Sequence, residues 1–116
     1  MTGTASELTL AGMIFTNANQ VISLGTASAN YAALPTSATQ LTVPSSINDL
    51  AVDLLGYYAF DSVPGTNQTL RLAAINSGYA SIQVSTKAGN TGATTMSWSM
   101  SGTTEISQLG IAVKSR

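Results

Sequence analysis

The sequence predicts an all-β fold, namely a single antiparallel β-sandwich or jelly roll of about eight strands. The clearest strand signal lies at residues 94–101, where Met96, Trp98 and Met100 alternate with Ser and Thr. Such alternation is typical of a strand with one buried and one exposed face. Turn-forming residues separate segments of this kind about every 8 to 15 residues. No window keeps apolar residues at helical spacing for about a dozen positions, so helices are not expected.

The most hydrophobic run, residues 49–60, is predicted to be the central strand. Leu50, Val52 and Leu54 share one face of a strand, and we expect that face to lie in the core. A helix is less favoured because Gly56 and the clustered aromatic residues lower helix propensity.

The other strands are expected between the remaining turn signals. Residues 26–40 contain few large apolar side chains and are broken by Pro35, so they are predicted to form a long loop with one helical turn at 29–33. Outside the central run, the predicted strands are 8–15, 20–24, 41–43, 69–75, 79–86, 94–101 and 106–113. The residues expected to be largely buried are Leu50, Val52, Leu54, Leu72, Ile82, Val84, Trp98 and Ile111.

Length and composition limit the possible functions. A chain of 116 residues fits one domain, predicted at 8–116, after a small polar arm at 1–7. The sequence has no cysteine and no histidine, which removes disulfides, thiolate metal sites and the commonest general base. A net charge of -1 offers no basic surface for a phosphate backbone, so nucleic acid is not an expected partner.

Charged residues make up only 8% of the chain, against about a quarter in ordinary globular proteins. We therefore expect a neutral surface rich in Ser and Thr hydroxyls. No run approaches the roughly 18 apolar residues of a membrane span, and residues 1–7 do not resemble a secretory signal. The expectation is a protein that folds in the cytoplasm and does not bind a membrane.

The carboxylates are the first candidates for chemistry. Asp49, Asp53 and Asp61 lie in or beside the central run, and a Ca²⁺ site would need several such oxygens close together. Asp53 with Asp61 or Glu105 could in principle form the carboxylate pair of a glycosidase. The simpler interpretation is that Asp49 and Asp61 are turn residues at the strand ends.

Asp53 lies on the face of the predicted strand opposite to Leu50 and Val52. It is expected to pair with Arg71 or Lys87 across the sheet. Neither this pairing nor the turn interpretation implies a reaction. No catalytic, cofactor-binding or metal-binding residue is therefore assigned, and no cofactor is expected.

Hydroxyls and aromatic rings are the other candidates. Ser and Thr are abundant, but a nucleophilic hydroxyl needs a positioned base, and only Lys87, Lys114 or a carboxylate remains. Asn67 fits a glycosylation sequon but is interpreted as a turn residue. Of the aromatic residues that could stack on sugar rings, Tyr57 and Tyr79 are predicted to point outward, whereas Trp98 is expected in the core.

The charge deficit suggests a function. Soluble monomers usually guard exposed strand edges with charged residues or proline, and this chain has few of either. A neutral β surface is well suited to a permanent assembly, because charges there would have to be desolvated. We expect a non-enzymatic structural protein of a virus or bacteriophage particle, such as a capsid or head-decoration subunit, located in the virion and assembled in the host cytoplasm.

The expected partners are further copies of the chain, in a cyclic homo-oligomer, and other virion proteins. The contacts are predicted to come from the 1–7 arm, the 26–40 loop and one uncharged strand edge. The alternative is a carbohydrate-binding or adhesive β-sandwich module of a fibre, a tail or an extracellular protein.

Overall fold

The all-β prediction is confirmed by the computed structural model, which describes all residues except 1–11, 20, 22, 59, 77 and 78. The described residues contain strands and no helix, and thus no helix long and apolar enough to cross a membrane. The strands are β1 (Ser28–Ser45), β2 (Leu50–Tyr58), β3 (Ser62–Pro64), β4 (Thr69–Ala74), β5 (Ala80–Ala88) and β6 (Gly92–Val113).

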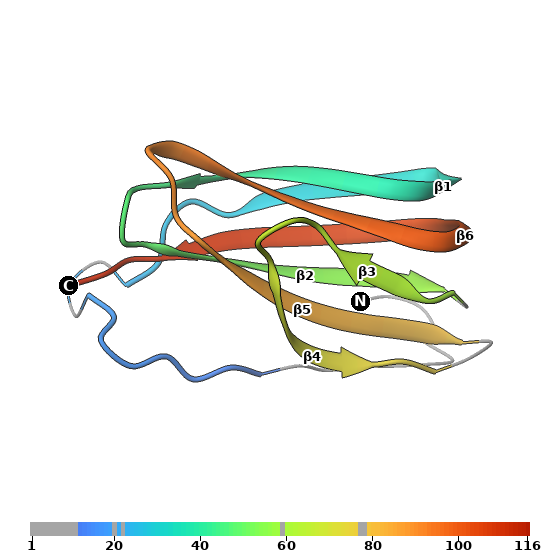
Figure 1. Cartoon of the computed structure of the whole chain (residues 1–116), viewed down its shortest axis with the longest axis horizontal. Coiled ribbons are helices and arrows are strands. Elements are labelled where there is room, and N and C mark those ends of the chain that lie inside the picture. Colours follow the sequence, from blue (N-terminus) through green and yellow to red (C-terminus); the bar gives the residue numbers. More distant parts are fainter. Residues whose placement is uncertain (1–11, 20, 22, 59, 77–78) are drawn as a thin grey trace, which may run out of the picture.

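The strands form one antiparallel sheet in the order β1-β6-β2-β5-β4, with β3 also paired to β6 (Figure 1). The sheet is not closed. The finer prediction of a sandwich or jelly roll of about eight strands is therefore not confirmed. β1 and β4 are the two ends of the strand order, and among the described residues β1 pairs with a neighbouring strand on one side only.

The two longest strands, β1 and β6, double back together (Figure 1). Residues 28–32 of β1 pair with residues 106–110 of β6, and residues 38–45 of β1 pair with residues 92–99 of β6. Between these two stretches the pairing register shifts on both sides of Thr36. The predicted strands 94–101 and 106–113 are thus two halves of one continuous strand, and no turn separates them.

The core lies between the two halves of this folded sheet. One half contributes side chains from the second half of β1 and the first half of β6. The facing half contributes side chains from β2 and from the second half of β6. They form two clusters, Leu41, Val43, Ala51, Met96 and Ala112 in one, and Leu55, Tyr57, Trp98, Met100 and Ile106 in the other.

Close approach between the halves depends on Gly110 of β6. A Cβ atom at this position would lie 2.5 Å from Cγ2 of Val43 and 2.9 Å from Cδ2 of Leu41. Both of these side chains are buried. Glycine therefore lets β6 approach the facing half of β1 in the core.

The predicted facing of the central strand is wrong. β2 spans the expected residues, but its buried positions are Ala51, Asp53, Leu55 and Tyr57, while Leu50, Val52 and Leu54 are only partly buried. Both faces of β2 carry large apolar side chains, so period-two alternation shows which residues share a face but not which face becomes the core.

The predicted core list is confirmed in part. Ile82, Val84 and Trp98 are buried, Leu50, Val52, Leu54 and Ile111 are partly buried, and Leu72 is exposed. Leu72 lies on β4, an edge strand whose six residues are all exposed. An edge strand without a facing layer keeps its apolar side chains at the surface.

The predicted loop at 26–40, with its helical turn, is wrong because most of this segment belongs to β1. Small side chains suffice for an edge strand, so β1 lacks the hydrophobic signature of a central one. The predicted strand 8–15 lies largely outside the described residues, and residues 12–15 are not in a strand. Of the predicted strand 20–24 the structure describes residues 21, 23 and 24, of which Leu24 makes an isolated bridge to Val113 and none lies in a strand.

Candidate functional site

Asp53 lies at the centre of a buried polar network. It is only 1% exposed, and its Oδ1 accepts a hydrogen bond from the Ser85 hydroxyl of β5. Its Oδ2 accepts hydrogen bonds from Nε1 of Trp98 at 2.6 Å and from Nε2 of Gln108 at 2.8 Å. Three donors thus satisfy the carboxylate, as a buried charge requires.

The predicted pairing of Asp53 with a basic residue across the sheet is wrong. Nε of Arg71 donates to Oγ1 of Thr86 at 2.8 Å, and Nζ of Lys87 donates to the Thr95 carbonyl at 3.1 Å. Asp53 faces the core, where the donors around it are neutral.

Further hydrogen bonds extend the network to the sheet edge. Oε1 of Gln108 accepts from the Thr39 hydroxyl at 3.0 Å, and the same hydroxyl oxygen accepts from Nδ2 of Asn30 at 3.1 Å. Asn30 and Thr39 come from the two halves of β1, so these bonds hold the doubled-back strand together. The network therefore tethers facing parts of the sheet, and its burial closes it to a substrate.

Asp49 is a turn residue, as predicted. Its Oδ2 accepts from the Ser46 amide at 2.7 Å and from Nζ of Lys114 at 2.7 Å. The ammonium group of Lys114, with backbone donors, holds the pKa of the Asp49 carboxyl below its ordinary value of 3.8, although burial acts in the opposite direction. The pair fastens the β1–β2 turn to the chain beyond β6.

The other carboxylates do not join Asp53 in an accessible site. Asp61 and Glu105 are exposed, whereas the Asp53 carboxylate is enclosed by its donors. The glycosidase pairs considered from the sequence therefore do not flank a common cleft. Within the part of the chain that the structure describes, no group of three His, Cys, Asp or Glu residues is placed to hold a metal ion.

The tyrosines that are buried and those that are exposed differ in part from the prediction. Tyr57 is buried, and its hydroxyl has no hydrogen-bond partner among the described residues. Tyr79 is exposed, as predicted, and Tyr58 and Tyr31 are 53% and 65% exposed. Trp98 is in the core, as predicted. Asn67 is also confirmed as a turn residue, with a φ of 62°.

Tyr31 and Tyr58 border a pocket of about 230 Å³ on the outer face of the sheet, together with Gly56, Glu105 and Ser107. Sequence reasoning missed this pocket because Tyr58 lies on the same face of the strand as Leu50, Val52 and Leu54, the face that was expected to lie in the core. Residues 26–40, which contain Tyr31, were not predicted to lie in the sheet.

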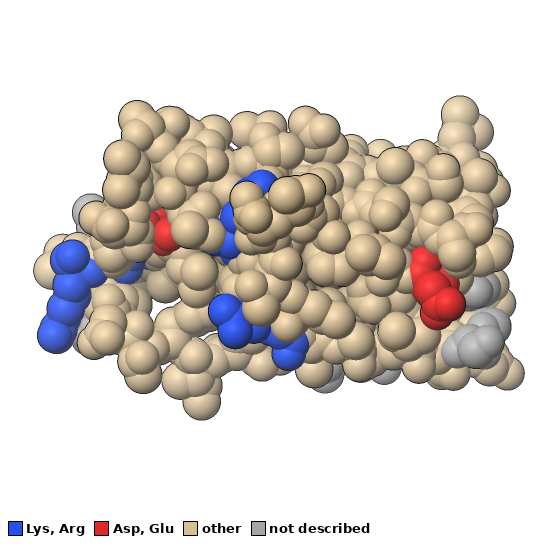
Figure 2. Space-filling view, viewed as in Figure 1, with Lys and Arg blue, Asp and Glu red and all other residues tan. Residues whose placement is uncertain are grey.

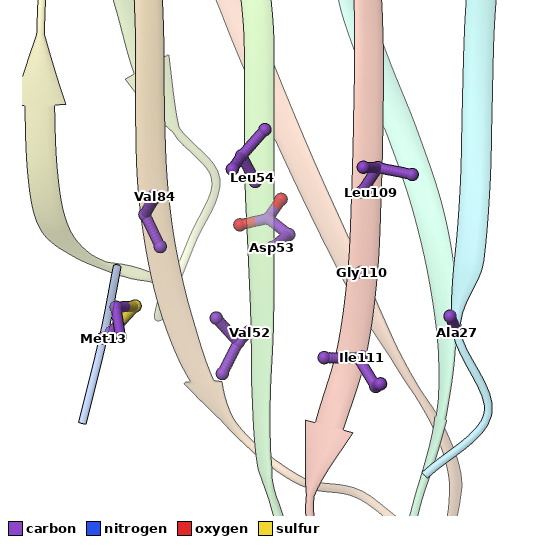
Figure 3. A pocket seen from close by; sticks show the side chains of 9 residues that line it. All are labelled: Met13, Ala27, Val52, Asp53, Leu54, Val84, Leu109, Gly110 and Ile111. Atoms are coloured by element: carbon purple, nitrogen blue, oxygen red, sulfur yellow. The ribbon is translucent and has the colours of Figure 1, made fainter. Parts of the chain in front are cut away.

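A second, apolar pocket of about 310 Å³ lies on the same outer face (Figure 3). Val52 and Leu54 of β2, Val84 of β5 and Leu109 of β6 line it, and Met13 lies beside them. Leu109, which shares a strand face with the predicted core residue Ile111, is more than half exposed. The face of β2 that was expected to form the core is thus a partly open apolar surface.

Charged residues are sparse in the chain as a whole. On the face shown in Figure 2, Lys, Arg, Asp and Glu side chains occupy only a few separate places. The eighteen residues of β1 include no charged residue, and within the residues that the structure describes β1 pairs only with β6.

Comparison with protein-family models, curated proteins and solved structures found no match to this chain.

Proposed function

We propose that this protein is a non-enzymatic structural subunit of a virus or bacteriophage particle, a capsid or head-decoration protein that acts through homo-oligomeric contacts. The observation that carries this proposal is the edge strand β1, which has eighteen residues, no charged side chain and, in the described part of the chain, one neighbouring strand. Long uncharged edges promote pairing with another chain. In this proposal the two facing halves of the sheet pack together as the two layers of a β-sandwich. The protein is located in the virion.

The backbone of β1 is suited to pairing over part of its length. The Gln40 carbonyl accepts a hydrogen bond from Nδ2 of Asn30 at 3.3 Å, and the Ala38 amide donates to Oγ1 of Thr36 at 3.4 Å. These groups therefore point away from β6. Because backbone groups alternate in direction along a strand, those of Thr42 also face the free edge. Pro44, which follows at the same parity, lacks an N–H and marks where regular pairing would end.

A charge placed on this edge tests the proposal. Thr42 is exposed on β1, so Thr42→Lys should leave the fold within about 0.5 kcal/mol of wild type while weakening subunit association. Thr42→Gln is the matched control, because it adds length without charge and should associate like wild type.

Multi-angle light scattering over a concentration series provides the measurement. We expect a wild-type oligomer, a shift toward monomer for Thr42→Lys, and weaker association after removal of residues 1–7. A wild-type protein that stays monomeric at high concentration, alone and with other particle proteins, contradicts the proposal.

The second candidate is a carbohydrate-binding or adhesive module. It draws support from the exposed Tyr31 and Tyr58 rings beside a pocket, since aromatic faces can pack on sugar rings. A monomer whose melting temperature rises with a saccharide would favour this candidate.

A further inference from the structure

The pocket between Tyr31 and Tyr58 is formed by three adjacent strands. Tyr31 of β1 pairs with Ser107 of β6, and Ser107 pairs with Gly56 of β2. Glu105 lies two residues from Ser107 on the same face, and Tyr58 lies two residues from Gly56. The backbones of the two tyrosines are therefore about 10 Å apart across the sheet and about 7 Å apart along it. A small group can fit between their side chains.

The floor of the pocket is low because its residues are small. Gly56 has no side chain, and a Cβ atom built there would meet nothing closer than the Ser107 carbonyl at 3.7 Å. Ser107 contributes only a hydroxymethyl group. The bulky Tyr31 and Tyr58 side chains stand on either side of this floor, and Glu105 lies between their strands.

The pocket carries a negative charge that no described side chain neutralises. Among the described residues the single ion pair is Lys114 with Asp49, so Glu105 has no ion-pair partner there. The other exposed acid, Asp61, follows β2 and therefore lies toward the same end of the sheet. Lys87 pairs with Ala51 near the opposite end of β2, and Lys114 follows the end of β6 that pairs with Leu50. Both ammonium groups therefore belong to the end of the sheet away from the pocket.

We propose that this pocket binds an organic cation, namely a guanidinium or alkylammonium group. The faces of aromatic rings attract cations within about 6 Å, and the unpaired carboxylate of Glu105 adds a charge-assisted hydrogen bond or an ion pair. A neutral saccharide would gain no such electrostatic attraction from Glu105, which is exposed. The inference goes beyond the proposed assembly function and does not rest on the β1 edge contact.

Tetramethylammonium chloride and arginine amide are the probes, and tert-butanol is a neutral control of similar size to the first. Titrations followed by amide NMR should give shifts at Gly56 and Ser107 that approach saturation with both cations at about tens to hundreds of millimolar, because each exposed contact contributes little, and none with tert-butanol. Equal shifts with tert-butanol, or saturable binding of glucose without binding of either cation, overturn the proposal.

Variants locate the site. Tyr31→Ala and Glu105→Gln should each weaken cation binding about two- to fivefold, and Gly56→Val should abolish it by filling the floor. Tyr79→Ala is the matched control, because Tyr79 is an exposed tyrosine outside the pocket, and it should bind like wild type. Unchanged binding in Glu105→Gln overturns the assignment of the carboxylate. None of these variants alters Thr42, so failure here is distinguishable from failure of the edge contact.

Two sources could supply the cation, a basic side chain of a second copy or a free ammonium compound. Excess tetramethylammonium added to the wild-type oligomer distinguishes them. A fall in particle mass assigns the pocket to a side chain of a second copy. Binding without any change in mass assigns it to a free ammonium compound.

Discussion

At the scale of single residues, Asp53 is the buried carboxylate that joins three strands through hydrogen bonds. It satisfies donors from Ser85, Trp98 and Gln108, which belong to two other strands. Asp53→Ala should therefore destabilise the fold by about 3 to 5 kcal/mol, because it leaves buried donors without an acceptor. Asp53→Asn should cost less, since its carbonyl can still accept from Trp98 and Gln108. Urea unfolding monitored by Trp98 fluorescence measures both effects.

The control for this prediction is Asp61→Ala. Asp61 is exposed, so its removal should change the free energy of unfolding by no more than about 0.5 kcal/mol. Equal stability losses at the two positions would contradict the structural role of the network.

Asp49 provides a pH-dependent prediction. Its pKa is below 3.8 in the folded state because Lys114 donates to the carboxylate. The stabilisation is therefore present above about pH 4 and is lost as the pH falls through the folded-state pKa. The difference in melting temperature between wild type and Asp49→Asn should be largest near neutral pH and shrink toward pH 2. A difference that stays constant over this range would show that the carboxylate charge does not contribute.

At the scale of strands, Gly110 and Gly56 form a matched pair on neighbouring strands. A Cβ at Gly110 would lie 2.5 Å from the buried Val43 side chain, whereas one at Gly56 has no contact closer than 3.7 Å. Gly110→Ala should therefore destabilise the fold by about 1 to 3 kcal/mol through overpacking. Gly56→Ala should be neutral or slightly stabilising. Thermal unfolding of the two variants decides the comparison, and similar melting temperatures would count against close packing of the sheet halves.

Strand prediction succeeded for segments with alternating or clustered apolar residues between clear turn residues. The Met96, Trp98 and Met100 face is buried as expected, and β2, β4 and β5 lie close to their predicted bounds. β1 was missed because an edge strand can be built from small, weakly hydrophobic residues. The continuity of β6 was also missed, because the residues from Ser101 to Thr104 are typical of a turn, and two separate strands were predicted on either side of them.

The candidate sites were less predictable than the strands. The partners of Asp53 come from β5 and from both halves of β6, and only the register of the sheet brings them together. The Tyr31 and Tyr58 pocket likewise depends on β1 lying next to the second half of β6. Neither arrangement leaves a local pattern in the sequence.

At the scale of the whole molecule, pairing between distant segments should make folding slow. Ser28 pairs with Gly110, and both long strands must be in place before the core closes. Domains dominated by such pairings fold on a time scale of about milliseconds to seconds. Stopped-flow refolding monitored by Trp98 fluorescence should show a main phase in this range, and folding in microseconds would contradict the expectation.

The buried network also has a consequence for errors in folding. A slip of one residue between β2 and β6 would turn Gln108 outward and bring Ser107 or Leu109 to face Asp53. The carboxylate would then lose a donor while still buried, at a cost of several kcal/mol. We therefore expect Asp53 to act as a check on strand alignment. Asp53→Leu, even if it packs well, should yield more misaligned and aggregated chains on refolding than wild type does.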